Sequence, residues 1–366
     1  MVEIKLLETR DYEKIADILL KSYVPQWESA GTPVWNSSYV EYLDKAYIGK
    51  EAVYVGAFDG DKMVAVGTGY VSDWNISEVG DVKGLGICHL GVLPDYQRQG
   101  IATEMVKKLM DEAKSKDAQL IFRICNDDLN DYKVLEKLGF EKKINNVFQF
   151  ARIMGKDVAD FAAEIKEYGF VMKKMLKVVA GLPDEDKGIE EGKIREGNAD
   201  DIKQCVEILN NYQSEAEILE KITEEDFKRN LDSFSVLKDP YNPIFMVWDV
   251  DGKIKSFALG RTELIRYRKG DANVNILIDI GFDQELSRKE KTAFAVSLLL
   301  YLKDKNPKNF ATNGAKIHLE NKALDKAGFN NDRSTRPLYA LALSDDIQEW
   351  FQDNWKYKNY YIPYQR

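Results

Sequence analysis

The chain has 366 residues, which is long for a single hydrophobic core, so its length predicts two domains. Hydrophobic residues make up 44% of the sequence and charged residues 31%, a balance that is typical of folded globular proteins and excludes a disordered chain. The formal net charge of −9 excludes the overall basic surface of a nucleic-acid-binding protein and favours a cationic substrate.

Cysteines, histidines and apolar runs exclude further classes. Cys88, Cys125 and Cys205 are odd in number and far apart, which argues against a disulfide framework and predicts a reducing, cytoplasmic compartment. With only two histidines and no close Cys or His pairs, no metal site is expected. The longest apolar run, residues 293–302, is about half the ~20 residues of a membrane-spanning helix, and the first residues carry no apolar signal segment. We therefore expect no membrane partner and no nucleic-acid partner.

The first elements in chain order are a helix, an aromatic segment and a hairpin. Residues 9–23, TRDYEKIADILLKSY, place apolar residues at helical spacing after polar N-cap residues. Residues 23–48 are rich in Trp and Tyr, which either pack in the core or hold a cationic amine against their faces; packing is favoured for most of them. Residues 53–69, VYVGAFDGDKMVAVGTG, put an Asp-Gly turn between two apolar strands, which predicts a β-hairpin.

A strand, a polar loop and a helix follow. Residues 85–93 are mostly apolar, which predicts a buried strand, and from Ile101 apolar residues recur on one helical face. The loop 96–100 therefore lies at a helix N-terminus, where free N–H groups and the helix dipole attract an anion. Gly100 lets phosphate oxygens approach the backbone. A Rossmann loop needs further glycines, and a Walker loop needs a Gly-Lys-Ser/Thr ending. Both features are absent here, so the pattern indicates a different pyrophosphate site.

The second half repeats the elements of the first. Three features recur in order at offsets of 189 to 192 residues: the hairpin turn at Gly60 and Gly252, the Gly-Phe ending at Gly139 and Gly328, and the helix end at Tyr23 and Tyr212. Each half is predicted to be an α/β unit of the α+β type, a mixed and mostly antiparallel sheet flanked by helices. The expected organisation is a first domain over 1–155, a helical connector and linker over 156–192, and a second domain over 193–366 with an aromatic C-terminal tail.

The first half resembles the GNAT superfamily of N-acetyltransferases. Gln97, Gly100 and Ala102, after the strand LGVLP, match its Gln/Arg-x-x-Gly-x-Gly/Ala signature, and the similarity continues to the helix ending EKLGF at Phe140. The resemblance implies an acetyl-CoA site, with the pyrophosphate at the amides of residues 98–103 and the pantetheine arm paired with the signature strand. The residues implied in cofactor binding are Leu90, Val92, Gln97, Arg98, Gln99, Gly100, Ile101, Ala102, Thr103 and Asn126. Gly91 is the residue expected to form a bulge that splays this strand from its neighbour.

The resemblance also implies direct acetyl transfer from the thioester to an amine, with the Leu90 amide as oxyanion donor. The strand positions that carry Glu or His in many family members are Gly86 and Cys88 here. His89 is the adjacent candidate for the catalytic base, provided that a bulge turns it; a packed histidine is the alternative.

Two further catalytic groups are suggested near the ends of helices and of the chain. Tyr132 lies one turn before the position where family members often carry a tyrosine, so it is the candidate acid, with simple packing as the alternative. The aromatic tail ends at Arg366, whose terminal carboxylate could serve as base, although an ordinary docked tail is favoured.

In the second half the position that matches Gly100 is expected near Lys291, and no glycine occurs between Gly281 and Gly314. A long side chain there would fill the space of a pyrophosphate, so this half is predicted to be a degenerate copy that binds no acetyl-CoA. The sequence thus predicts a tandem GNAT protein, an acetyl-CoA-dependent N-acetyltransferase acting on an amine acceptor. The alternatives are a non-catalytic acyl-CoA-binding sensor and a scaffold for a protein partner.

Overall fold

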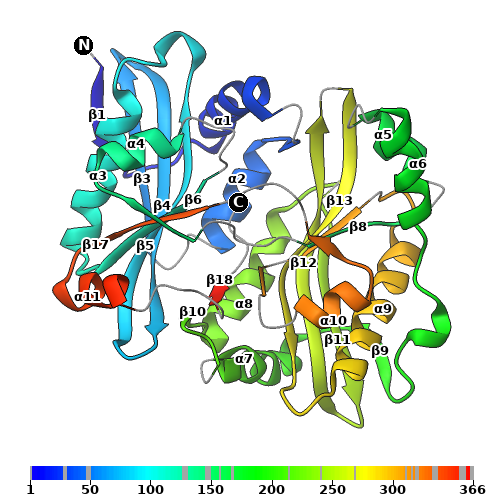
Figure 1. Cartoon of the computed structure of the whole chain (residues 1–366). Helices are drawn as coiled ribbons and strands as arrows, with labels where there is room; N and C mark the ends of the chain where they lie inside the picture. The colour runs from blue at the N-terminus through cyan, green and yellow to red at the C-terminus, as the bar shows by residue number, and fades with distance from the viewer. Residues whose placement is uncertain are drawn as a thin grey trace.

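The computed structural model describes residues 2–27, 31–46, 51–125, 131–144, 150–155, 158–165, 169–212, 215–239, 241–267, 269–309, 311–314, 316–317, 321–331, 337–353 and 360–362. Within them, two mixed β-sheets stand side by side, with helices between them and on their outer faces (Figure 1). The predicted α/β fold of two sheet-and-helix units is therefore confirmed.

Ten strands of the described residues form the first sheet, in the order β15-β18-β10-β4-β5-β6-β17-β7, with β3 pairing with β4 and β1 with β3. They are β1 (Glu3–Leu6), β3 (Ala52–Asp59), β4 (Lys62–Ile76), β5 (Gly80–Val92), β6 (Leu120–Ile124), β7 (Glu141–Ile144), β10 (Ile218–Glu220), β15 (Lys316–Ile317), β17 (Leu338–Ala342) and β18 (Tyr360–Ile362). The predicted hairpin is β3–β4, and β5 contains the predicted signature strand.

Eight strands of the described residues form the second sheet, in the order β16-β8-β14-β13-β12-β11-β9, with β2 pairing with β12. They are β2 (Thr32–Pro33), β8 (Phe150–Ile153), β9 (Lys193–Glu196), β11 (Pro243–Val250), β12 (Lys253–Tyr267), β13 (Gly270–Phe282), β14 (Ala311–Gly314) and β16 (Asn330–Asn331). The turn between β11 and β12 has positive φ at Asp251 and Gly252, which suits the Asp-Gly pair that predicted a hairpin.

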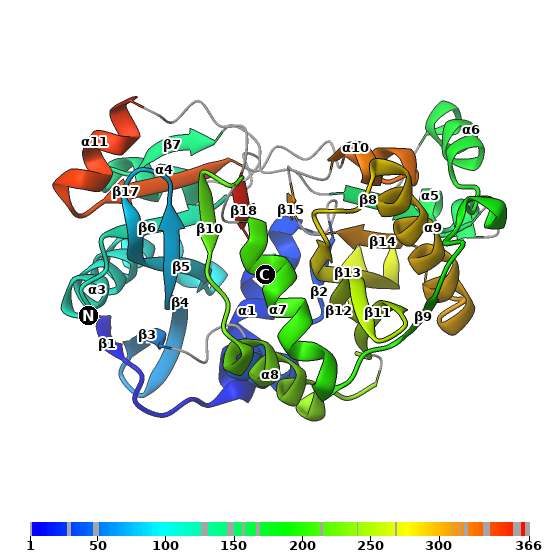
Figure 2. The ribbon, with the colours of Figure 1, turned by 90° about the horizontal axis from the view of Figure 1, so that it is seen from below.

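Helices pack on both faces of the sheets. They are α1 (Tyr12–Trp27), α2 (Ser37–Ala46), α3 (Ile101–Ser115), α4 (Asp131–Lys137), α5 (Ala159–Ile165), α6 (Phe170–Val179), α7 (Ile202–Asn211), α8 (Glu224–Ser233), α9 (Arg288–Lys305), α10 (Asn321–Lys326) and α11 (Asp345–Asp353). Seen from below, α1, α7 and α8 lie between the sheets (Figure 2). One hydrophobic cluster joins these helices to both sheets through residues such as Ile15, Leu209 and Phe257, so the two halves share a core. No helix of the described residues is long and apolar enough to cross a bilayer.

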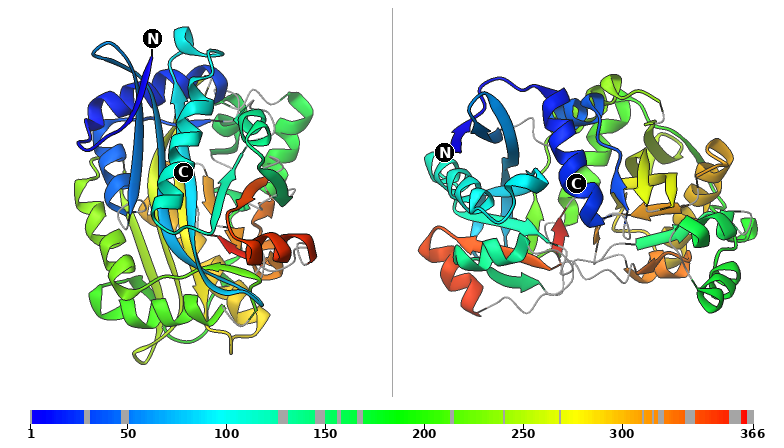
Figure 3. Two further views of the ribbon diagram at one scale, coloured as in Figure 1. Left: turned by 90° about the vertical axis from the view of Figure 1, so that its left-hand side faces the viewer. Right: turned by 90° about the horizontal axis from the view of Figure 1, so that it is seen from above.

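The two halves exchange strands. β17, from the end of the chain, pairs with β6 and β7 in the first sheet, and Figure 1 shows it in orange among the cyan strands. In return, β8 pairs with β14 and β16 in the second sheet. Figure 3 shows that α11, which follows β17, also lies beside the first sheet. The division expected at 155 and 193 follows the order of the sequence, but strands cross it in both sheets. Among the described residues, the first sheet contains β10, β15, β17 and β18 from beyond residue 193, and the second contains β2 and β8 from before residue 155.

The strand pair β4–β5 of the first sheet and the strand pair β12–β13 of the second share one irregularity. In the first sheet the register shifts between Thr68 and Gly69, so that Cys88 is an extra residue in β5. In the second sheet the register shifts between Leu259 and Gly260, so that Ile278 is an extra residue in β13. A bulge at the same place in both hairpins supports the duplication inferred from the sequence.

Candidate active site

The bulge of β5 lies at Cys88 and not at Gly91, so the expectation for Gly91 was wrong. Gly91 pairs regularly with Val66, and a Cβ built on it would lie 3.1 Å from Leu19 Cδ2 and 3.3 Å from Ser22 Oγ. Glycine is therefore needed there because α1 packs closely against β5. Desolvation raises the pKa of the Cys88 thiol to about 12, so this thiol is not a ready nucleophile.

Beside the bulge, β5 separates from its parallel neighbour β6. The two strands pair only from Gly84 to Gly86. Beyond Gly86, the buried Arg123 of β6 crosses the gap and donates from Nη1 to the carbonyl oxygens of Cys88 at 3.1 Å and Ile87 at 3.4 Å. We call this separation of β5 from β6 the splay. The guanidinium group of Arg123 closes the end of the splay that lies nearest to the paired residues.

Asp131, the first residue of α4, fixes this guanidinium. Its Oδ2 accepts from Arg123 Nη2 at 2.9 Å and from Nε at 3.2 Å. Burial by itself would lower the pKa of Arg123, but the Asp131 carboxylate outweighs it and the pKa is raised, so the arginine stays charged. A buried charge of this kind is stable only because it is paired and hydrogen-bonded.

Two residues after the bulge, the N–H of Leu90 donates to the hydroxyl oxygen of Tyr23 at 2.9 Å. Tyr23 lies in α1, and its ring centroid is 5.9 Å from that of Trp35. Burial raises the pKa of the Tyr23 phenol, which therefore stays protonated at neutral pH. Sequence reasoning selected Leu90 but not Tyr23 or Arg123, because both reach β5 from other elements.

The loop between β5 and α3 has the geometry expected of an anion site. Gly100 is the N-cap residue of α3 with φ 83°, no side chain caps the helix there, and a Cβ on Gly100 would meet no atom within 4 Å. Ile101, Ala102 and Thr103 form the first turn, whose N–H groups point out of the helix end. The loop is exposed, so an anion can reach these groups from solvent.

Three side chains of the loop have different roles. Gln97 donates to the carbonyl of Val92 at 3.0 Å, and Gln99 donates to the carbonyl of Asp95 at 3.1 Å, so both shape the loop. Arg98 is exposed and has φ 62°, an unusual conformation for a residue with a side chain. The predicted cofactor residues from Leu90 to Thr103 are therefore brought together along one path, whereas Asn126 lies outside the described residues.

The two predicted catalytic side chains lie in different surroundings. The bulge places His89 on the same face of β5 as Gly86, where its buried ring meets Trp35 edge-on at 4.9 Å between centroids. Tyr132 stacks on Tyr339 of the exchanged strand β17, with centroids 6.2 Å apart. The bulge thus turns His89 as the sequence analysis required, and both rings have packing contacts. The terminal carboxylate of Arg366 lies outside the described residues.

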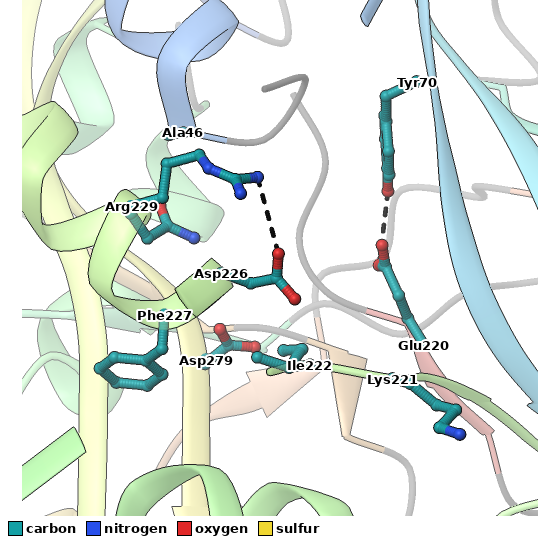
Figure 4. Close-up of a pocket in the computed structure, with 10 residues that line it drawn as sticks. Ala46, Tyr70, Glu220, Lys221, Ile222, Asp226, Phe227, Arg229 and Asp279 are labelled. Atoms are coloured by element: carbon teal, nitrogen blue, oxygen red, sulfur yellow. Dashed lines mark hydrogen bonds and ion pairs between the residues drawn. The ribbon is translucent and has the colours of Figure 1, made fainter. Parts of the chain in front are cut away.

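A small cavity of about 50 Å³ lies between the halves, and Figure 4 shows its lining. Tyr70 of β4 donates to Glu220 of β10 at 3.4 Å, and Asp279 of β13 is 2% exposed. Asp226 and Arg229 of α8 form an ion pair at 3.6 Å. Sequence reasoning missed these carboxylates, although Asp279 interrupts the apolar run ILIDIGF and could have marked a buried polar site.

The second half has no comparable loop. Eight residues, 93–100, join β5 to α3, whereas five residues, 283–287, join β13 to α9. The N-cap of α9 is Ser287, so the residue that matches Gly100 is Ser287 and not Lys291 as expected. Ser287 and Glu290 form a capping box in which the Glu290 carboxylate accepts the Ser287 N–H at 2.8 Å. The N-cap of this helix is thus satisfied by its own side chains.

Comparisons with known proteins agree with this geometry. Residues 12–140 match the family model described as Acetyltransferase (GNAT) family. The chain therefore contains a GNAT acyltransferase domain, in the half that holds the splay and the loop. No match was found among the curated proteins.

Solved structures match the whole chain, not only this domain. A structure of Saccharomyces cerevisiae N-myristoyltransferase with bound myristoyl-CoA has a TM-score of 0.70 at 16% identity, covering 93% of this chain and 82% of that one. A tandem GNAT protein from the clavulanic acid biosynthesis pathway has a TM-score of 0.57 at 12% identity, covering 94% of this chain and 99% of that one. The chain thus has a tandem GNAT fold with a second copy that lacks the loop.

Proposed function

We propose that the protein transfers an acetyl group from acetyl-CoA directly to an amine acceptor, with the first half binding the co-substrate. The observation that carries the proposal is the open edge of β5 beyond Gly86, which leads to the uncapped helix N-terminus at Gly100. An extended arm with amide groups can pair with this edge, and a pyrophosphate can bind the amides of residues 98–103. Coenzyme A combines both features in one molecule.

A short acyl group fits the surroundings of the bulge better than a long one. Arg123 and Asp131 form a charged pair beside Cys88, and Tyr23 reaches the same edge from α1. A long apolar chain would gain little from contact with these polar groups. This argument favours acetyl-CoA, although three matching structures contain myristoyl-CoA.

The cavity between the halves supports an amine as the acceptor. Three of its lining residues are carboxylic acids, Glu220, Asp226 and Asp279, and the chain as a whole is acidic. Of its two cationic residues, Arg229 is paired with Asp226, and Lys221 is paired with Asp81 at 2.6 Å. The resulting negative field favours a cationic group.

The transfer needs three proton movements. The ammonium group of the acceptor must lose one proton before its nitrogen attacks the thioester carbon, and we assign this proton to His89 or to Glu220. After the C–N bond has formed, the nitrogen loses a second proton to solvent. The C–S bond then breaks, and Tyr132 donates a proton to the departing thiolate. Tyr132→Phe should lower kcat about 100-fold while the affinity for acetyl-CoA stays unchanged. An unaltered kcat would leave Tyr132 with only its packing contact to Tyr339.

The proposal is tested by measuring CoA release from acetyl-CoA and from myristoyl-CoA in the presence of a panel of amines. Amine-dependent release from acetyl-CoA, lost in both His89→Gln and Glu220→Gln or in one of them, supports the proposal and identifies the base. Tight binding of acetyl-CoA without release would indicate a sensor. Failure of both acyl-CoA compounds to bind would exclude the proposal and leave a scaffold.

A further inference from the structure

Two side chains form hydrogen bonds with the edge of β5 beyond Gly86. Arg123 donates to the carbonyl oxygens of Ile87 and Cys88, and Tyr23 accepts the N–H of Leu90. These backbone groups lie where β6 no longer pairs with β5. An extended ligand that adds to this edge must therefore compete with a side chain for at least one backbone group.

The two occupants are held differently. Arg123 is 6% exposed and is bound to Asp131 through two of its nitrogens. Tyr23 is partly buried and lies in the last part of α1, two residues before Pro25, which has no N–H to donate to the preceding turn. Moving Arg123 would leave a buried carboxylate unpaired, whereas moving the uncharged Tyr23 hydroxyl would leave no buried charge without its counter-ion. Tyr23 is therefore the occupant that a ligand can displace.

The duplicated half contains a matched tyrosine in a different role. Tyr212, 189 residues after Tyr23, accepts the N–H of Phe282 at 3.1 Å, at the end of β13. Tyr212 is 1% exposed, and the loop between β13 and α9 ends at a capped helix N-terminus. Tyr23 instead bonds Leu90, two residues from the bulge and beside the splay. The hydrogen bond between a helix-end tyrosine and a backbone N–H is therefore buried in the second half, whereas in the first half it lies at the candidate site.

We propose that the Tyr23 hydroxyl oxygen accepts the hydrogen bond of the Leu90 N–H that a carbonyl oxygen of the acyl-CoA arm accepts in the complex. When acyl-CoA binds, its carbonyl oxygen replaces the Tyr23 hydroxyl as the acceptor. This inference rests on the proposed function. The oxygen belongs either to an amide of the pantetheine arm or to the thioester. Tyr23 is thus a positioning residue that keeps the amide bonded in the free protein and sets the affinity for the ligand.

The test compares Tyr23→Phe with the matched control Tyr212→Phe, using CoA and acetyl-CoA as probes in calorimetry. Tyr23→Phe removes the competing acceptor, so acetyl-CoA should bind about two- to tenfold more tightly, the effect of one net hydrogen bond. A gain for acetyl-CoA alone identifies the thioester oxygen, and an equal gain for CoA identifies the pantetheine arm. Tyr212→Phe should lower the melting temperature and leave both affinities unchanged.

Hydrogen exchange at the Leu90 amide gives a second measurement. The amide should exchange faster in free Tyr23→Phe than in the free wild type, and acetyl-CoA should slow it in both proteins. Unchanged or weaker binding by Tyr23→Phe, or an equal gain in Tyr212→Phe, would overturn the inference while leaving the proposed function intact. Absence of acyl-CoA binding to the wild-type chain would overturn both.

Discussion

At the scale of single residues, Gly100 has two roles in our account. It adopts a positive φ at the start of α3, and it leaves space for phosphate oxygens beside the backbone. Its φ is 83°, and a Cβ built on it would meet no protein atom within 4 Å. A β-branched residue there is strained, and its side chain would project into the space that our account assigns to phosphate oxygens.

Gly100→Val should therefore weaken acetyl-CoA binding at least about tenfold, the loss of one hydrogen bond to a charged group. Gly252→Val is the matched control, because Gly252 has φ 84° and equally empty surroundings in a turn of the second half. Both variants should lose similar stability in thermal denaturation, but only Gly100→Val should lose affinity in calorimetry. Equal affinities for the two variants would remove the phosphate-loop assignment.

A second residue-scale feature joins α2 of the first half to β12 of the second. Arg261 and Glu263 are fully buried and paired, and Arg261 also donates to Tyr39 at 2.9 Å and to Tyr42 at 3.3 Å. Removing one member of such a pair leaves an uncompensated buried charge.

Arg261→Met should therefore lower the free energy of unfolding by about 3–5 kcal/mol in urea denaturation. The control is Arg266→Met on the same strand, since Arg266 and Asp271 form a partly exposed pair at 2.9 Å. That variant should lose less than about 1 kcal/mol. Similar losses in both variants would show that the buried cluster does not hold the halves together.

At the scale of elements, local patterns predicted what depends on neighbouring residues. The start of α3 at Ile101 follows from its amphipathic pattern and from Gly100, and the structure places both as expected. The bulge could not be placed, because the extra residue is defined only by the pairing of β5 with β4. Lys291 was matched to Gly100 by a constant offset, which a shorter loop before α9 invalidates.

The site itself combines elements that the sequence keeps apart. Tyr23 and Arg123 reach β5 from α1 and β6, and Glu220 and Asp279 reach the cavity from β10 and β13. Each is an ordinary residue in its local pattern, and only the packing of the two sheets brings them to one place. Tandem sequence similarity therefore predicted the fold and the phosphate loop, but not the side chains that surround the bulge.

At the scale of the whole molecule, the exchange of β8 and β17 couples the two halves. Each sheet needs a strand from the opposite half, and a shared hydrophobic cluster fills the space between them. Short apolar strands have the same pattern in either sheet, so the sequence could not reveal the exchange.

The full chain should therefore unfold in a single cooperative transition. Scanning calorimetry should give equal calorimetric and van't Hoff enthalpies, the signature of two-state unfolding. Two resolved transitions would show that the halves are stable independently and that the exchanged strands contribute little to the coupling.

The central claim is that acyl-CoA binds once per chain, in the splay and loop of the first half. A crystal structure of the full chain with acetyl-CoA tests it most directly. We predict pyrophosphate oxygens at the amides of residues 98–103, the pantetheine arm along β5, and no ligand at the Ser287–Glu290 cap of α9. Acetyl-CoA bound at α9, or bound elsewhere with the Gly100 loop empty, would contradict the account.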